Sequence, residues 1–326
     1  MNKRSEINDL VDSMKPHVLA LTEFGASATV MDGELGVEGY SLYRGNHSDG
    51  NGGPGRGVAL YLSNSLQHSA CPLFEDAEFD CSAWSIVKTS NSKTLLVGVV
   101  YRSPNSPDSN NQNLLSMLRI ATTANFSQVL ICGDFNLPQI DWNSRRSLAA
   151  EASFTSRFIE EVEDMSLFQH VTTPTRYRND QKSCLDLVFS SEENMVNEVM
   201  ELPPIGKSDH VCQMWEVVVE EVIFKNTAKT RHNYKRADWS SIKNGLRNFR
   251  FEESDSPTAM NSRLVECISD LKEKHIPRCR PKSIQHRLPW RNAGLKAQRA
   301  EKWRRWKKFK NSGLPRDYDF YKMERN

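Results

Sequence analysis

The chain has 326 residues with a formal net charge of +2, and its composition is ordinary for a globular protein. No apolar run approaches the roughly 18 residues that a membrane span requires, and the basic N-terminal stretch MNKRSEINDLVDSM has no apolar core behind it. The sequence therefore predicts no transmembrane segment, no secretory signal and no membrane partner. The 7 cysteines are scattered without CxxC spacing, which argues against a structural zinc site and for a reducing, intracellular location.

The two parts of the chain carry opposite charge. Residues 1–225 contain 17 Lys and Arg against 30 Asp and Glu, whereas residues 226–326 contain 26 against 11. Residues 272–310 are the densest basic segment, with 15 basic residues and two acidic ones. An acidic body with a basic tail is typical of proteins whose tail contacts nucleic acid or anionic lipid.

Apolar residues recur with helical spacing in some segments and form short strand-like runs in others. Helices are predicted for residues 7–14, where Lys15-Pro16 ends the pattern, and for 114–120 and 154–165. Strand-like runs occupy residues 17–23, 57–63, 84–88, 95–101, 129–133, 184–190 and 211–219. Many strands follow one another without a helix between them. We therefore predict an α/β fold of two packed β-sheets flanked by helices rather than a doubly wound sheet.

The glycine-rich segment GNHSDGNGGPGRG (45–57) lacks the GxxxxGK[ST] spacing of a phosphate-binding loop. A strand follows the segment instead of a helix, so no helix N-terminus would face a phosphate. The segment is therefore predicted to be a flexible hairpin loop.

Polar side chains stand at the ends of several predicted strands. Each alone has an ordinary explanation, because Asp and Asn cap turns and a histidine beside a strand is often simply hydrogen-bonded. Together they can converge on one rim of a sandwich, where a rigid scaffold holds functional loops. The set supplies what metal-assisted phosphodiester hydrolysis requires: carboxylates for a hard cation, an acceptor for the attacking water and donors for the phosphate. The residues are Glu23, Tyr101, Asn105, Asp134, Asn136, Asp186, Asp209 and His210.

Five short motifs occur in the order and spacing of the endonuclease/exonuclease/phosphatase superfamily, which includes the apurinic endonucleases and pancreatic deoxyribonuclease. They are LTE (21–23), YRSPN (101–105), GDFN (133–136), LDLVF (185–189) and SDH (208–210). Longer stretches resemble the nuclease domain encoded by non-LTR retrotransposons: GYSLYR (39–44), GVALYLSNSL (57–66), GDFNLPQIDW (133–142) and PWRNAGLKAQRAEKWRRWKKFK (289–310).

The resemblance covers residues 10–222 and continues more weakly through the rest of the chain. It implies a DNase I-like, four-layer sandwich over residues 1–222. A basic, mainly helical tail over residues 223–326 would then lead toward a reverse transcriptase.

The resemblance also implies a cofactor and its ligands. The cofactor would be Mg²⁺, with Mn²⁺ able to substitute, and its ligands would be Glu23 and Asp209. Tyr101 resembles the tyrosine that touches the scissile phosphate, and Asn105 would add a further contact to nucleic acid.

The remaining motif residues would carry the chemistry. Asp134 would orient or deprotonate the attacking water, and Asn136 would hold a phosphate oxygen. His210 would bond to the phosphate and stabilise the developing charge, with Asp186 fixing its tautomer. The residues themselves independently favour that last pair, because a carboxylate buried in CLDLVF needs a hydrogen-bond donor.

The sequence departs from the superfamily at its start. The family fold opens with a strand that ends in an Asn near the metal, whereas this sequence starts on the following helix and places no Asn at a strand end before Glu23. A missing first strand would expose sheet edges and weaken metal binding. Phe24 also stands where the subgroup usually has a polar residue or a tryptophan.

Aromatic and basic side chains interleave in the tail. A helix there could lay cations on phosphates and aromatic rings on bases, so DNA, or RNA, is the predicted partner. The alternative is an amphipathic helix that packs on a neighbouring domain and leaves a solvated basic face. The residues predicted to bind nucleic acid are Arg291, Trp303, Arg304, Arg305, Trp306, Lys307 and Lys308.

These patterns and the resemblance together predict a Mg²⁺-dependent endonuclease of retroelement origin that nicks DNA, with activity impaired by loss of the first strand. We expect an intracellular protein with access to the nucleus. Within the same chemistry, the alternative is a phosphatase acting on a small or lipid phosphoester. From a different class, the alternative is a non-catalytic remnant that binds nucleic acid through residues 272–310.

Overall fold

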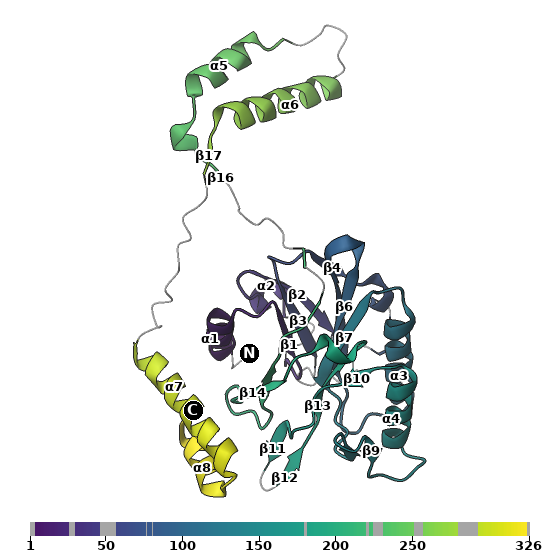
Figure 1. Cartoon of the computed structure of the whole chain (residues 1–326). Coiled ribbons are helices and arrows are strands. Elements are labelled where there is room, and N and C mark those ends of the chain that lie inside the picture. The colour runs from purple at the N-terminus through teal and green to yellow at the C-terminus, as the bar shows by residue number, and fades with distance from the viewer. Residues whose placement is uncertain are drawn as a thin grey trace. The chain divides into compact units, whose positions relative to one another are not determined.

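The computed structural model describes residues 4–25, 30–45, 57–75, 77–79, 81–178, 181–219, 222–223, 231–250, 257–279 and 293–324. The chain forms two compact units, one of residues Met1–Lys225 with Asn292–Asn326 and one of residues Asn226–Arg291 (Figure 1). Residues 46–56 of the predicted glycine-rich loop lie outside the described part of the chain. The described residues begin in a helix at Arg4, so the predicted lack of a preceding strand stays a prediction.

The smaller sheet of the first unit has strand β3 between two antiparallel neighbours, in the order β1-β3-β2. Side chains alternate along β3, so Leu60 and Leu62 face the core between the sheets, whereas Ala59 and Tyr61 pack with Ile7 of helix α1. The elements of this layer are α1 (Arg4–Met14), β1 (Val18–Leu21), α2 (Asp32–Leu35), β2 (Tyr40–Gly45) and β3 (Val58–Ser63).

The larger sheet has the order β10-β13-β7-β6-β5-β4, and all of its pairs are antiparallel except β6 with β7. A parallel pair needs a crossover connection, which helix α3 supplies between β6 and β7. The elements are β4 (His68–Ala70), β5 (Ser82–Lys88), β6 (Thr94–Tyr101), α3 (Asp108–Thr123), β7 (Gln128–Asp134), α4 (Phe154–Asp164), β10 (Phe168–Gln169) and β13 (Asp186–Ser190).

The two sheets pack face to face, with helices on the outer side of each (Figure 1). On one side, apolar residues of α3 and α4 such as Leu114, Leu118 and Phe158 are fully buried against the larger sheet. On the other side, α1 covers the smaller sheet. This four-layer α/β sandwich confirms the predicted fold class.

Six of the seven predicted strands are confirmed to within two residues at each end. The exception is the run at 211–219, of which only β15 (Cys212–Met214) is a strand, paired with β14 (Met200–Leu202). Strand β2 was not among the predicted strands. The remaining short elements of this unit are η1 (Pro72–Phe74), η2 (Ser90–Ser92), β8 (Ile140–Asp141), β9 (Arg146–Ser147), β11 (Arg176–Arg178), β12 (Gln181–Ser183) and η3 (Glu193–Met195).

The predicted single tail at 223–326 spans parts of both units. Helices α7 (Ala293–Ser312) and α8 (Pro315–Glu324) belong to the first unit and form what we call the C-terminal hairpin. The second unit contains η4 (Tyr234–Arg236), α5 (Trp239–Asn248) and α6 (Pro257–His275). Its two ends come together in a short antiparallel ladder of β16 (Arg231–His232) and β17 (Arg278–Cys279).

None of the helices in the described residues combines the length and apolar character that crossing a membrane would demand.

Gly133 allows β6 and β7 to approach closely just before the two strands end. Its φ is +150°, and a Cβ atom at this position would lie 1.9 Å from the carbonyl oxygen of Val100. Real Cβ atoms do not come that close to a backbone atom, so only glycine fits here. The GDFN motif therefore begins with glycine for a steric reason.

We expect the Gly133→Ala variant to lower the free energy of unfolding by about 2 kcal/mol or more, because the methyl group forces the two strands apart. Chemical denaturation of the full chain measures the loss. Gly33→Ala is the matched control, since a Cβ atom there meets nothing within 4 Å. Equal stability of the two variants would contradict this explanation of the motif.

Candidate active site

Three predicted site residues lie side by side because of strand register. Tyr101 at the end of β6 pairs with Asp134 at the end of β7, and Asp134 pairs with Asp186 at the start of β13. Paired residues on neighbouring strands point to the same face of the sheet, about 5 Å apart. The backbone ladder thus aligns a phenol and two carboxylates in one row at one end of the larger sheet.

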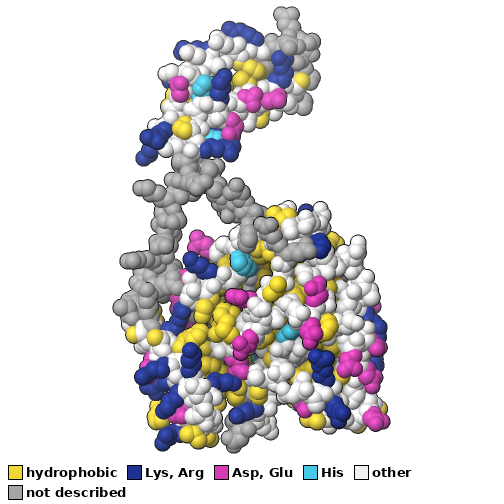
Figure 2. All heavy atoms as spheres, viewed as in Figure 1, with side chains coloured by type: hydrophobic (Ala, Val, Ile, Leu, Met, Phe, Trp, Pro, Cys, Tyr) yellow, Lys and Arg dark blue, Asp and Glu magenta, His cyan; other side chains and the backbone are white. Residues whose placement is uncertain are grey.

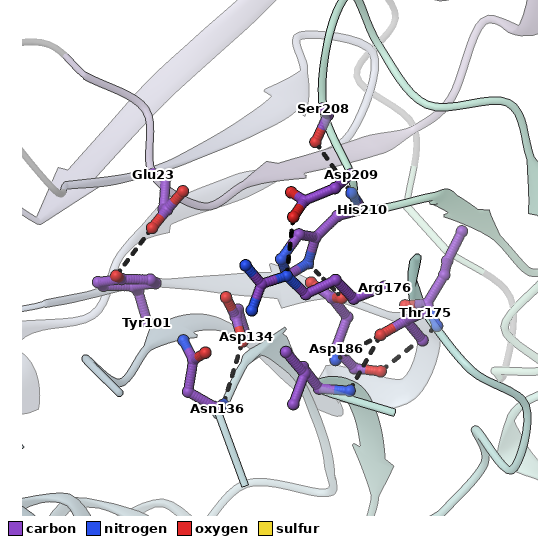
Figure 3. A network of polar contacts seen from close by, with 12 residues as sticks. Glu23, Tyr101, Asp134, Asn136, Thr175, Arg176, Asp186, Ser208, Asp209 and His210 are labelled. Carbon is purple, nitrogen blue, oxygen red and sulfur yellow. Dashed lines mark hydrogen bonds and ion pairs between the residues drawn. The ribbon is translucent and has the colours of Figure 1, made fainter. Parts of the chain in front are cut away.

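His210 joins this row through a hydrogen bond between its Nδ1 atom and Oδ2 of Asp186, 2.8 Å long (Figure 3). Burial alone would lower the pKa of His210, but the hydrogen bond and negative charge of Asp186 raise it to about 8. The imidazole is therefore cationic at neutral pH, and the bond to Asp186 directs Nε2 away from that carboxylate. The prediction that Asp186 lies within hydrogen-bond reach of the His210 ring is confirmed.

The segment Thr175–Tyr177 holds both partners of that pair in place. The Thr175 hydroxyl accepts hydrogen bonds from the backbone N–H groups of Leu185 and Asp186, each 3.0 Å long. The backbone carbonyl of Thr175 accepts a hydrogen bond from the N–H of Val211. The N–H of Tyr177 donates to the carbonyl of Asp209, and both bonds are 2.8 Å long. This segment therefore fixes the backbone on either side of His210.

Asp209 forms an ion pair with Arg176, with 2.9 Å between Oδ2 and Nε. Burial raises the pKa of Asp209, but the hydrogen bond and charge of Arg176 outweigh burial and hold this pKa below its ordinary value. Sequence reasoning missed Arg176, because the arginine lies outside the motifs. Only the pairing of its segment with the SDH motif brings it to the site.

Glu23 lies next to Tyr101, whose hydroxyl donates to its Oε1 atom over 2.9 Å (Figure 3). Glu23 has a φ of +48°, in the left-handed region that non-glycine residues rarely adopt. Such backbone strain is concentrated at functional sites. The strained turn after β1 therefore brings Glu23 from the smaller sheet to the end of the larger one.

Asn136 also has a left-handed backbone, with a φ of +49°, and its N–H donates to Oδ1 of Asp134 over 3.0 Å. Its side-chain Nδ2 donates to the carbonyl of Arg102 over 2.9 Å, and the residue is 8% exposed. One of its two amide hydrogens is thus held by the protein, and the other has no partner among the residues that the structure describes and is available to a ligand.

Arg102 is a buried residue that sequence reasoning missed, although it stands inside the YRSPN motif. Its guanidinium donates from Nη1 to the carbonyls of Phe135 and Asn136, and from Nε to Oδ1 of Asn111. It also lies over the Phe154 ring, 4.9 Å from the centroid. Burial lowers its pKa, which the charge of Asp134 partly offsets. Arg102 therefore holds the backbone of the GDFN loop in place through these two carbonyl groups.

The protein alone does not balance the negative charge of the site. Burial, followed by the charges of Asp186 and Glu23, raises the pKa of Asp134, while the charge of His210 lowers it. In the described part of the chain, the ligand atoms of Asp134, Asp186 and His210 lie within 4.8 Å of one another, which is close enough to hold a metal ion. The donors of Glu23 and Asp209 are not part of this group of three.

A hard divalent cation fits this set. The His210 ring is cationic and its Nδ1 atom is bonded to Asp186, so the carboxylate oxygens of Asp134 and Asp186 are the donors that remain, and hard cations prefer oxygen ligands. Burial and the charges of nearby carboxylates disfavour the ionised form of Asp134 even beside His210, and a bound cation would favour that form.

The remaining predicted residues lie apart from this group. Asn105 is exposed in the turn after β6, and Arg291 lies outside the described residues. Trp306 is 2% exposed and packs on Tyr177, so its ring offers no face to a base, contrary to its predicted stacking role. The other predicted tail residues lie on α7: Trp303, Arg304, Arg305, Lys307 and Lys308.

The raised pKa of His210 gives one prediction. In metal-free protein we expect the His210 ring to titrate near pH 8, and Asp186→Asn to lower this pKa because the main source of stabilising charge is lost. NMR of the histidine ring signals measures both values. His170, whose pKa burial lowers, is the internal control and should not respond. An unchanged His210 pKa in the variant would contradict the assigned role of Asp186.

The buried position of Arg102 gives a second prediction. Arg102→Lys should lower the free energy of unfolding by roughly 2 kcal/mol or more, because a lysine cannot replace three directed hydrogen bonds and leaves buried acceptors unpaired. Thermal and denaturant unfolding measure the change. Arg119→Lys, at a half-exposed arginine, is the control and should stay within about 0.5 kcal/mol of the parent. A similar loss in the free energy of unfolding of both variants would contradict the role assigned to the Arg102 hydrogen bonds.

Comparisons with known proteins agree with this geometry. Residues 95–213 match the family described as endonuclease-reverse transcriptase. A search of the curated proteins found no match. Among solved structures, the endonuclease domain of TRAS1, a telomere-specific non-LTR retrotransposon, is 13% identical with a TM-score of 0.50, covering 67% of this chain and 94% of that one. The AP endonuclease LMAP from Leishmania major is 17% identical with a TM-score of 0.52, covering 67% of this chain and 83% of that one.

At such identities the solved structures establish a common fold, whereas the family match is made on the sequence itself and includes the stretch from Tyr101 to His210. The family match spans the GDFN and SDH motifs, whose side chains converge at one end of the larger sheet. Residues 95–213 thus match the endonuclease-reverse transcriptase family, and the chain shares its fold with a retrotransposon endonuclease and with an AP endonuclease.

Proposed function

We propose that the chain is a divalent-metal-dependent phosphodiesterase that nicks DNA. The observation that carries the proposal is the Asp186–His210 pair, 2.8 Å apart, in the same row as Asp134 and Tyr101. A cationic donor with its orienting carboxylate, beside a buried carboxylate that can accept a proton, supplies the donors and acceptors of phosphodiester hydrolysis. The match to endonuclease-reverse transcriptases and the fold shared with two endonucleases support DNA as the substrate.

In this mechanism His210 acts on the phosphate. Its cationic ring donates from Nε2 to a non-bridging phosphate oxygen, where negative charge develops as water attacks. Asp186 keeps the ring in place, so no reorientation is needed during the reaction. Asn136 donates its second amide hydrogen to another oxygen of the same phosphate.

Asp134 acts on the attacking water. Its Oδ1 atom already accepts from the Asn136 N–H, so its other oxygen is the acceptor for a water proton. Its raised pKa makes the ionised carboxylate, the form that a bound cation would favour, a stronger base for this proton. As the water oxygen bonds to phosphorus, the bond from phosphorus to the leaving deoxyribose oxygen breaks, and that oxygen takes a proton from solvent.

Mg²⁺ is the proposed cofactor, with Mn²⁺ as a substitute. The ion would be held by Glu23 together with the carboxylates of Asp134 and Asp186. When bound, the ion polarises a phosphate oxygen and neutralises charge. The hydroxyl of Tyr101 fixes the Glu23 carboxylate through its 2.9 Å hydrogen bond. Asp209, the second predicted ligand, stays part of the proposal and would reach the ion while it is paired with Arg176.

A DNA substrate requires that the protein reach DNA inside the cell, so an intracellular location with nuclear access belongs to the proposal. RNA as a second ligand of the basic segment also stays a proposal.

Nicking of supercoiled plasmid by the full chain tests the function. We expect activity with Mg²⁺ or Mn²⁺ and none after chelation. His210→Ala should lower the rate on the order of 10²-fold, the typical cost of removing one preorganised transition-state donor. Glu23→Gln should raise the metal concentration needed for half-maximal rate. His17→Ala, at an exposed histidine in the turn before β1, is the matched control and should retain full activity.

The same assay separates the alternatives. Hydrolysis of a small phosphomonoester without nicking would favour the phosphatase. If the protein binds plasmid but does not nick it with any metal ion, the result would favour the non-catalytic remnant. Equal nicking by the parent and the Glu23→Gln, His210→Ala double variant would show that the activity comes from a contaminant.

A further inference from the structure

Side-chain alternation gives the segments around His210 two different faces. Arg176 and His210 face the candidate site, whereas their neighbours Tyr177 and Val211 lie in a separate buried cluster. Successive side chains of an extended segment point to opposite sides, so both sets are fixed by one stretch of backbone. Whatever packs on Tyr177 and Val211 therefore sets the position of Arg176 and His210.

The C-terminal hairpin packs on that second face. Tyr177 meets the rings of Trp306 and Phe309 edge to face, each with 5.8 Å between ring centroids. Trp306, Phe309 and Tyr321 are 2%, 6% and 0% exposed. Edge-to-face aromatic packing of this kind is directional as well as apolar, so the hairpin restrains the orientation of β11 and not only its burial.

Lys310 adds polar contacts to the same place. Its Nζ donates to the Tyr177 hydroxyl over 2.5 Å and forms an ion pair with Glu201 over 2.6 Å. The Tyr318 hydroxyl donates to the Tyr177 carbonyl over 3.4 Å. The hairpin thus contacts the ring, the hydroxyl and the backbone of the residue next to Arg176.

A second connection reaches the loop that precedes the SDH motif. One oxygen of Glu6, on α1, accepts from the N–H of Gly206 and from Nζ of Lys302, each over 3.0 Å. Arg299 donates to the carbonyl of Asp9 on the same helix over 3.2 Å. Helix α7 therefore holds α1 against the loop that leads into Ser208, Asp209 and His210.

We propose that the C-terminal hairpin is a positioning element of the candidate site, which holds the Arg176 and His210 segments in register with Asp186. Lys310 and Trp306 are its positioning residues, and both act through Tyr177. The inference deepens the proposed function and rests on it where activity is measured.

The test compares full-length variants at Lys310. Lys310→Met keeps the aliphatic stem but removes both polar contacts, and Lys310→Arg retains a cation that can reach the same acceptors. For Lys310→Met we expect kcat for plasmid nicking to fall on the order of 10-fold or more, with KM nearly unchanged, because the reacting groups are misplaced while substrate binding is not. Lys310→Arg should recover most of the loss. Trp306→Leu should act in the same direction as Lys310→Met.

A second readout does not depend on activity. In metal-free protein, NMR signals of the His210 ring should shift in Lys310→Met and Trp306→Leu and return toward the parent in Lys310→Arg. If the parent does not nick DNA, the proposed function fails, yet these signals still decide whether the hairpin positions His210. If Trp306→Leu does not fold, the two Lys310 variants decide.

Two control variants separate positioning from stability. Arg316→Met removes an exposed cation of the same hairpin, on α8, that has no assigned role in catalysis or binding. Ile159→Val weakens the core under α4, a different part of the same unit. Neither should move the His210 signals or kcat, although Ile159→Val should lower the melting temperature. The inference is overturned if Lys310→Met and Trp306→Leu lower the melting temperature as Ile159→Val does while the His210 signals and kcat stay at parent values.

Discussion

The register of three strands, β6, β7 and β13, is the constraint on which the rest of the site depends. It places Tyr101, Asp134 and Asp186 at equivalent positions on adjacent strands, so the backbone ladder sets their spacing before any side chain interacts. A slip of one residue in β7 would turn Asp134 into the core and break the row. Gly133 makes this register possible, because the strands come too close there for any side chain.

Much of this could be predicted from the sequence, for identifiable reasons. The strand runs are short, apolar and flanked by turn residues, so their positions follow from local pattern. Residues such as Asp186 are conspicuous because a carboxylate is costly inside an apolar run. Convergence of the motifs followed from resemblance to a known fold, since no local pattern reports which strand ends are neighbours.

What sequence reasoning missed was long-range. Arg102 looks like one surface cation among many, yet the backbone carbonyls of the GDFN loop surround it. Arg176 reaches Asp209 only because β11 lies beside the SDH segment. Trp306 suggested base stacking because it stands among lysines and arginines, whereas its partner is Tyr177, 129 positions earlier in the printed sequence. Such pairings depend on tertiary contacts that a one-dimensional pattern does not contain.

Basic residues of the tail also form ion pairs with acidic residues inside the first unit. Lys302 and Lys310 of the basic tail pair with Glu6 and Glu201 of the acidic body, and Lys308 pairs with Asp317 inside the hairpin. The positive charge of these lysines, which the sequence suggested was available to bind phosphates, is therefore partly neutralised by carboxylates of the first unit. The packing alternative considered for the tail therefore accounts for Trp306, Phe309 and several of the basic residues of α7.

The first unit is discontinuous in sequence, and this has a consequence for its biosynthesis. Residues 226–291 form an insertion whose ends meet in the β16–β17 ladder, an arrangement that lets a module interrupt another domain without separating its halves. Because chains emerge from the ribosome N-terminus first, the β-sandwich is synthesised before α7 and α8 exist. The apolar surfaces of Tyr177 and Val211 stay uncovered until then. A ribosome that stalls within the insertion would thus release a sandwich with a bare apolar patch, which is a substrate for chaperones and a seed for aggregation.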